Sequence, residues 1–250
     1  MCKLSSVGEQ TAEKPAPTSR RARLRAETTR EIKAIALRHV AEGGPDAISL
    51  RAIARDMGMT AGAIYSYFAT RDDLVTTLIN DLYASLMDTL DAALAAAPPG
   101  DPAARILAWG QAFRTWSLAN REGFRLIYGD GVSGYQVPEG GAAPELEHRA
   151  CTVLTGLVAD AWPHAAPAHA DDTYTWDDIG PALATAARAE YPELPPAAVA
   201  LALRVWGRTH GLVSLEVYGH LTHQIHDPAR LYRAELCDLI RSLGLTPPRT

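Results

Sequence analysis

The sequence predicts an all-α fold, with an N-terminal helix-turn-helix head and a C-terminal helical bundle. Leu and Ala dominate the composition, and the alternating Val, Ile and Thr runs typical of strands are rare. Apolar residues recur at helical spacing, as at Ile32, Ile35, Ala36 and Val40. The 250 residues, 47% of them hydrophobic, suffice for one large domain or two small ones.

The net charge of −5 is distributed unevenly along the chain. Residues 1–71 hold 12 Lys and Arg against 7 Asp and Glu, whereas residues 72–250 hold 12 against 22. A basic head on an acidic body favours a localised surface that binds a polyanion. Chance clustering of solvated charge is the alternative reading of this feature.

The chain has no segment of about 18 uncharged apolar residues, so we expect no transmembrane helix and no membrane partner. Residues 1–19 are polar and lack the apolar core of a signal peptide, which favours a disordered leader and a cytoplasmic protein. Cys2, Cys151 and Cys237 are odd in number and far apart, which indicates reduced thiols rather than a disulfide framework.

Four helices are expected between about Thr28 and Ala97. The first ends at Gly43-Gly44-Pro45, the second spans Leu50 to Met57, and the third spans about Ala61 to Phe68. Ser49, Thr60 and Thr70 are the expected N-caps of the second, third and fourth, and Asp73 comes close to completing a capping box with Thr70. Gly58 suits the sharp turn between the second and third.

The fourth helix carries a leucine every four residues from Leu74 to Leu94. Each step of four turns about 40° around a helix, so the row winds about halfway round. No flat neighbour covers such a row. We therefore expect this helix to pack against the head at its start and against a second domain at its end.

Further helices are expected at about 102–119, 121–129, 145–161, 181–189, 196–223 and 228–243, with loops at 129–144 and 162–180. The expected division is a leader over 1–19, a helix-turn-helix domain over 20–72, and an effector-binding and dimerisation domain over 73–250.

The segment from Ser49 to Leu74 has helix-turn-helix character, because two short amphipathic helices meet at Gly58. Such a unit places its second helix in the DNA major groove. Over residues 25–80 the chain resembles the TetR family of bacterial regulators, on the pattern Ile53-Ala54, Gly58, Ile64-Tyr65, Tyr67-Phe68, Arg71 and Leu74. The resemblance implies an all-helical head, a helical effector-binding body and a homodimer.

Candidate DNA contacts follow from the motif and the resemblance. Tyr65 matches the family's phosphate-contacting tyrosine, and Arg71 matches a basic position that holds backbone phosphate; packing within the head is the alternative for Tyr65. Ala61 and Gly62 stand where family members often have larger base-reading side chains. We therefore expect phosphate contacts and DNA shape to contribute more of the affinity and specificity. The full set is Arg20, Arg21, Arg23 and Arg25 as an arm before the first helix, with Ser49, Arg51, Thr60, Ala61, Gly62, Tyr65, Ser66, Tyr67 and Arg71.

Aromatic side chains at helical spacing in the body are candidates for an effector site. Plain core packing is the alternative, but the resemblance implies a small-molecule pocket. The run from Trp206 to Gly211 resembles a Trp…His-Gly signature of one TetR-type C-terminal class, and a satisfied core histidine is the alternative for His210. The candidates are Trp109, Phe113, Trp116, Phe124, Tyr128, Trp206 and His210.

The last two helices are expected to pair with their copies in a second subunit as a four-helix bundle. Glycines spaced by 4 and 8 would permit close helix approach, and leucines would supply the apolar seam. The candidates are Gly207, Gly211, Leu212, Leu215, Gly219, Leu236, Leu239 and Ile240. A two-fold dimer would read a near-palindromic operator, with half-sites about 34–36 Å apart.

The resemblance and these candidate sites together lead us to expect a sequence-specific DNA-binding transcriptional regulator, a repressor that a small-molecule effector releases from its operator. Two other classes of function compete with this prediction. His220, His223 and His226, followed by Asp227, are potential metal ligands, but spacings of three along one helix do not close a tetrahedron. No P-loop, nucleophile elbow or HExxH motif occurs, so we expect no enzyme, no metal and no cofactor. An architectural DNA binder without an effector would have little use for the acidic, aromatic-rich body.

Overall fold

The computed structural model describes residues 19–129 and 131–249. Every regular element within them is a helix, as the sequence predicts. The expected leader, with Cys2, lies outside them apart from Ser19. The α-helices are α1 (Arg20–Gly43), α2 (Leu50–Asp56), α3 (Ala61–Tyr65), α4 (Arg71–Ala96), α5 (Pro102–Ala119), α6 (Arg121–Tyr128), α7 (Pro144–Ala165), α8 (Pro181–Glu190), α9 (Pro196–Val217) and α10 (Pro228–Ser242). Three 3-10 turns, η1 (Pro45–Ala47), η2 (Ala166–His169) and η3 (Trp176–Asp178), connect them.

The predicted N-caps position the helices of the head. The Ser49 and Thr60 hydroxyls accept hydrogen bonds from the backbone N–H groups of Ala52 and Ala63, at 3.4 and 3.2 Å. Thr70 and Asp73 form a complete capping box at the start of α4. Local side-chain chemistry therefore sets where α2, α3 and α4 begin.

Two helix ends differ from the expectation. The first helix begins at Arg20 rather than near Thr28, because Ser19 caps it by accepting a hydrogen bond from Ala22 N–H. The helix expected to reach His223 ends at Val217, because the backbone turns at Gly219 with a φ of 80°.

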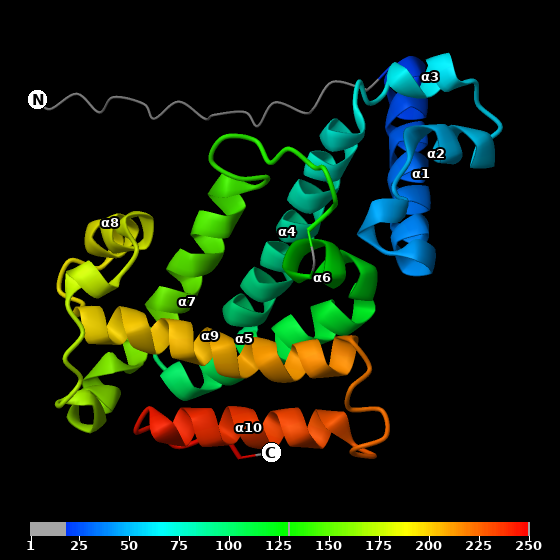
Figure 1. Cartoon of the computed structure of the whole chain (residues 1–250). Helices are drawn as coiled ribbons and strands as arrows, with labels where there is room; N and C mark the ends of the chain where they lie inside the picture. The colour runs from blue at the N-terminus through cyan, green and yellow to red at the C-terminus, as the bar shows by residue number, and fades with distance from the viewer. Residues whose placement is uncertain (1–18, 130, 250) are drawn as a thin grey trace, which may run out of the picture.

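Helix α4 joins the head, α1 to α3, to the body, α5 to α10 (Figure 1). Leu74 and Leu78 are buried near the head, and Leu86 and Leu90 are buried further along the helix. α4 packs against α5, α6 and α7. The main neighbours of α4 are thus helices of the body, and the head packs on the body chiefly through α1 and α6. The expected domain boundary at residue 72 falls inside the first turn of α4.

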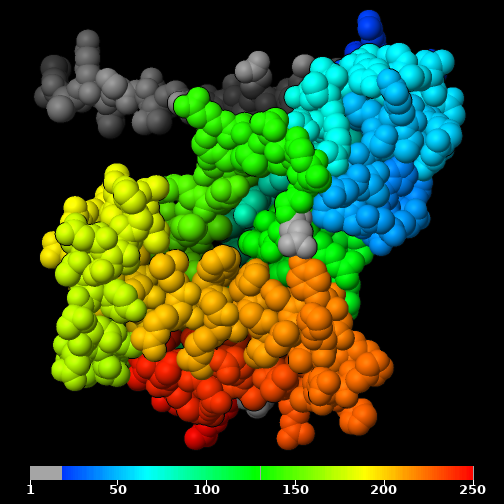
Figure 2. Space-filling model, viewed as in Figure 1, coloured from blue at the N-terminus to red at the C-terminus, as the bar shows by residue number. Residues whose placement is uncertain are grey.

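The body is a bundle in which α9 lies across α5 and α7, with α10 packed along α9 and α5 (Figure 1). Close approach of α6 to α4 requires Gly123, because a Cβ there would lie 2.4 Å from Leu82 Cδ2. In the space-filling view the head stands at one corner, and α9 and α10 form a continuous surface on the opposite side (Figure 2). No helix in the described part of the chain is long and apolar enough to cross a bilayer.

Candidate nucleic-acid interface and internal cavity

Helices α2 and α3 form a tight helix-turn-helix. Gly58 takes a φ of 65°, which lets the Met59 N–H donate back to the Ala54 carbonyl at 2.8 Å. Ile53 on α2 and Ile64 on α3 are both fully buried. Burial of these two side chains fixes which face of α3 turns outward.

The outward face of α3 offers few groups that hydrogen-bond. Thr60, Ala61, Gly62 and Ser66 are exposed, but the Thr60 hydroxyl caps the helix and the Ser66 hydroxyl donates to the Ala63 carbonyl at 2.7 Å. The largest exposed side chain that can hydrogen-bond on this face is Tyr65, which is 44% exposed. The DNA contact expected of Tyr65 stays a prediction, and its ring is open to solvent.

The arginine arm is helical rather than an extended segment before the first helix. Arg20, Arg21, Arg23 and Arg25 occupy the first turns of α1, and all four are exposed. Arg25 donates to the Ser66 carbonyl at 2.7 Å, and its guanidinium lies 4.7 Å from the centre of the Tyr67 ring.

These contacts dock the start of α1 against the residues that follow α3. A shallow groove runs between the two segments, lined by Arg20, Arg21, Leu24, Arg25, Ser66 and Tyr67. The arginines therefore border the recognition helix from one side.

Arg71 joins the head to the body. Its guanidinium donates to the carbonyls of Ile48 at 3.0 Å, Ser133 at 2.8 Å and Asp46 at 3.5 Å. Arg51, on α2, is exposed. The phosphate contact expected of Arg71 thus competes with three acceptors inside the chain.

The segment between α6 and α7, residues 131–142, lies along the start of α4, and we call it the strap. Ser133 N–H donates to the Asp46 carboxylate at 2.6 Å, and Gln136 N–H donates to the Asp72 carboxylate at 3.0 Å. The Tyr135 hydroxyl lies 2.8 Å from the Thr76 hydroxyl. The strap therefore contacts both the head, at Asp46, and the first turns of α4.

Further along α4, the Asn80 side chain donates to the Ala142 carbonyl, just before α7 begins at Pro144. Separate hydrogen bonds thus fasten the strap to Asp46 in the head at its start and to α4 along its length, as far as Ala142.

A cavity of about 310 Å³, open to solvent where Leu203 and Trp206 are exposed, lies between α4, α5, α7 and α9, with α6 and α8 contributing one residue each. This volume is at the lower end of the range of small-molecule sites. The lining is Tyr83, Leu86, Leu90, Trp109, Phe113, Tyr128, Glu147, Ala150, Cys151, Leu154, Thr155, Leu183, Val199, Ala202, Leu203 and Trp206.

The cavity has a polar group of side chains at the α4–α7 side. Burial raises the pKa values of the Tyr83 and Tyr128 phenols and of the Cys151 thiol, and the nearby Glu147 carboxylate raises all three further. The two phenols and the thiol are therefore neutral near pH 7, and each carries a proton that it can donate to a ligand.

The expected effector residues divide into two groups. Trp109, Phe113, Tyr128 and Trp206 line the cavity. The other three pack behind it: the Trp116 indole donates to the Ser85 hydroxyl at 3.1 Å, and Phe124 and His210 stack with ring centres 5.3 Å apart.

His210 Nδ1 lies 3.2 Å from the Ser214 hydroxyl, whereas its buried Nε2 has no partner among the described residues. Burial lowers the pKa of His210, so the ring is neutral near pH 7. His210 is thus a neutral ring in an aromatic wall.

Sequence reasoning missed the contribution of α7 to the cavity. Its lining residues, Glu147, Ala150, Cys151, Leu154 and Thr155, are spaced 3, 4, 7 and 8 residues from the first, which is one helical face. A helical face that mixes polar and apolar residues in this way could have indicated the wall of a ligand site. The α4 residues Tyr83, Leu86 and Leu90 gave none, because a cavity wall and a core face have the same period.

The expected dimer residues do not share one surface. Leu236, Leu239 and Ile240 are fully buried within the chain, so they are wrong as an outward seam; Leu236 packs on Gly110 of α5. Gly219 lies in the turn after α9, so it does not permit helix approach either. Gly207 and Gly211 face open space, Leu215 is 41% exposed, and Leu212 is partly buried.

The histidines weighed as metal ligands follow α9 in a turn segment. His220, His223 and His226 are all exposed, as is Asp227, which caps α10. Within residues 19–129 and 131–249, no three His, Cys, Asp or Glu side chains come together to hold a metal ion.

Two family models match the chain. The model described as "Bacterial regulatory proteins, tetR family" matches residues 32–78, and "Tetracyclin repressor-like, C-terminal domain" matches residues 106–239. The first coincides with the helix-turn-helix and the second with the body that holds the cavity.

Known proteins share both parts. HTH-type transcriptional regulator Rv1816 of Mycobacterium tuberculosis is 30% identical over 221 residues, 86% of this chain and 91% of that protein. The crystal structure of regulatory protein SCO4313 is 35% identical with a TM-score of 0.68, covering 90% of this chain and all of that one. A tetR-family regulatory protein from Rhodococcus RHA1 shares the fold at 20% identity, with a TM-score of 0.61 over 88% of this chain and 98% of that one.

The helix-turn-helix formed by α2 and α3, the helical body and these matches lead to one assignment: the chain belongs to the TetR family of DNA-binding bacterial transcriptional regulators.

Proposed function

We propose that this regulator is a ligand-released repressor, which binds a near-palindromic operator as a homodimer. Its family consists of transcriptional regulators rather than enzymes. One observation carries the proposal: α4 runs from the DNA-binding head, where Arg71 anchors it, to the cavity, where Tyr83, Leu86 and Leu90 line it. A single helix therefore connects the two sites that such a repressor must couple.

Operator binding would rest on the exposed face of α3 and the arginines at the start of α1. Tyr65 and the polar groups around it offer few direct base contacts, whereas four exposed arginines lie beside them. Cationic side chains next to a recognition helix bind phosphate and release counterions. We therefore propose that phosphate contacts and DNA shape contribute more to binding than side-chain readout of bases.

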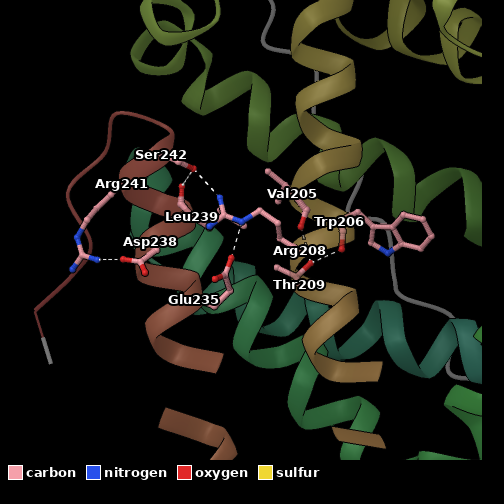
Figure 3. A network of polar contacts seen from close by, with 9 residues as sticks. All are labelled: Val205, Trp206, Arg208, Thr209, Glu235, Asp238, Leu239, Arg241 and Ser242. Atoms are coloured by element: carbon pink, nitrogen blue, oxygen red, sulfur yellow. Dashed lines mark hydrogen bonds and ion pairs between the residues drawn. The ribbon is translucent and has the colours of Figure 1, made fainter. Parts of the chain in front are cut away.

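The homodimer would form through the outer face of α9, with α10 supporting it. Gly207, Gly211 and Leu215 follow one another at four-residue spacing and leave room for a second helix. Helix α10 is fixed to α9 from the side: Arg208 donates to the Glu235 carboxylate at 2.6 Å and to the Ser242 hydroxyl at 3.0 Å (Figure 3). A rigid α9–α10 pair suits a two-fold interface.

Release would follow from movement of α4 and the strap. A molecule in the cavity touches α4 and α7, and the strap joins α7 to the head through Ser133 and Asp46. A ligand shifts such an equilibrium only by its differential affinity for two states. We propose that the occupied cavity favours a position of α4 and α7 in which the two heads no longer match the operator.

The test is selection of bound duplexes from a random DNA library by the full-length protein. The proposal predicts enrichment of one near-palindrome, with half-sites about one helical turn or a whole number of turns apart. Enrichment of DNA without a common sequence would contradict it and favour an architectural DNA binder. A single asymmetric site, bound by a monomer in sedimentation velocity, would contradict the homodimer alone.

A further inference from the structure

We propose that the cavity selects an organic cation with an apolar body, held at the Glu147 carboxylate and between aromatic rings. This inference rests on the proposed effector role of the cavity and adds the chemical class of the ligand. It starts from the charges that face the cavity.

Among residues 19–129 and 131–249, Glu147 is the only carboxylate in the cavity lining, and none of the Lys, Arg or His side chains described there lines it. Within the described residues, the Glu147 carboxylate forms no ion pair and accepts no hydrogen bond. The nearest arginine along the sequence, Arg149, is engaged elsewhere, because it pairs with Asp91. The cavity therefore holds a negative charge that the chain itself does not neutralise.

The aromatic rings around the cavity suit the same ligand. Trp109, Tyr83, Tyr128 and Trp206 all line it, and the face of an aromatic ring attracts a cation. Neutral His210 stands behind Tyr128, with ring centres 4.8 Å apart, so it adds no positive charge. The phenols and the Cys151 thiol are neutral, and the Thr155 hydroxyl donates to the Cys151 carbonyl at 2.8 Å.

An anionic ligand would meet the opposite conditions. Its charge would lie near Glu147, with no basic side chain in the lining to pair with it. The aliphatic side chains of the lining would bury the apolar body of either ligand equally well; they include Leu86, Leu90, Leu154 and Val199. The sign of the ligand's charge therefore decides whether the cavity favours it, and a cation is favoured over an anion.

The test compares 3-phenylpropyltrimethylammonium with its neutral isostere, in which carbon replaces nitrogen, and with the anion 4-phenylbutanoate. Trp109 and Trp206 line the cavity, so quenching of intrinsic fluorescence reports binding to full-length protein. We expect the cation to bind about tenfold tighter than the isostere, equivalent to about 1.4 kcal/mol, and the anion to bind more weakly than both.

The decisive variant is Glu147→Gln, which keeps the shape of the side chain and removes its charge. We expect the ratio of cation to isostere affinity to fall several-fold without reaching one, since the Glu147 charge is removed while the aromatic rings still attract the cation. The matched control is Glu145→Gln, because Glu145 lies in the same first turn of α7, is exposed and does not line the cavity. This control removes the same charge and should keep the ratio.

The outcomes separate the ligand class from the effector site. Equal affinity for cation and isostere in wild type, or an unchanged ratio in Glu147→Gln, would overturn the cation and leave the cavity as a site. Binding of none of the three probes would overturn the effector cavity as well. Matching near-ultraviolet circular dichroism of both variants establishes that they fold.

Discussion

Replacing Arg71 with alanine separates two roles that one side chain cannot fully serve. The sequence resemblance implies that Arg71 holds DNA phosphate, whereas the structure engages it with the Ile48 and Ser133 carbonyls at 3.0 and 2.8 Å. If the second role dominates, the substitution weakens the junction of head and body rather than the contact with DNA.

The magnitude follows from the two shorter bonds. A hydrogen bond from a charged donor contributes about 1.5–3 kcal/mol when well buried. The Arg71 side chain is 30% exposed, so we take a reduced total of about 2 kcal/mol for both bonds. For a chain of this size, that loss lowers Tm by about 4–8 °C.

The assay combines thermal unfolding, followed by circular dichroism, with operator affinity measured over a range of salt. Arg55→Ala is the matched control, because Arg55 is exposed on α2 and makes no side-chain hydrogen bond within the described residues. We expect the control to change Tm by no more than about 2 °C.

The salt dependence distinguishes the two roles of Arg71. Each lost phosphate contact would reduce the slope of log K against log salt by about 0.9. We expect the Arg71→Ala slope to equal the wild-type slope while Tm falls. An unchanged Tm together with a reduced slope would refute the reasoning and restore the phosphate contact.

Three other predictions concern packing, titration and assembly. Gly123→Ala forces a Cβ against Leu82 and should lower the free energy of unfolding by about 1–3 kcal/mol in urea titrations, whereas Gly180→Ala, which meets open space, should not. Because burial lowers the pKa of His210, the unfolded chain binds a proton at this residue at higher pH than the folded chain, so the free energy of unfolding should fall as pH drops below 6.5. In urea titrations at pH 7.5 and 5.5, His210→Asn should reduce that fall. An identical fall in wild type and variant would contradict the prediction. Leu215→Glu places like charges at the proposed two-fold interface and should give monomers in sedimentation velocity; an intact dimer would exclude this face.

The sequence predicted helix starts well, because local chemistry sets them. Thr70 with Asp73, and Asp101 before Pro102, mark their helices unambiguously, and α5 begins and ends as expected. The sequence predicted the start of α1 poorly, because the capping Ser19 stands among polar residues where no apolar residues recur at helical spacing. The end of α9 at Val217 depended on the conformation of a single glycine.

The sequence could not show which helix, or which subunit, packs against a given apolar helix face. Leu236 and Leu239 have the period of a seam, but that period does not say whether the seam faces another chain or α5; here both side chains are buried within the protomer. The same limit hid Tyr83 in the leucine-rich α4. The family resemblance assigned Arg71 to a phosphate contact, and only the fold shows the Ser133 carbonyl of the strap beside it.

The most direct test of DNA reading by α3 compares two tyrosines of equal exposure. Tyr65 on α3 is 44% exposed, and Tyr174 on the body is 45% exposed. Fluorescence anisotropy with the selected operator should show that Tyr65→Ala lowers affinity by about tenfold or more, while Tyr174→Ala changes it by less than about twofold. Equal affinities of the two variants would contradict the assignment of α3 as the DNA-reading helix.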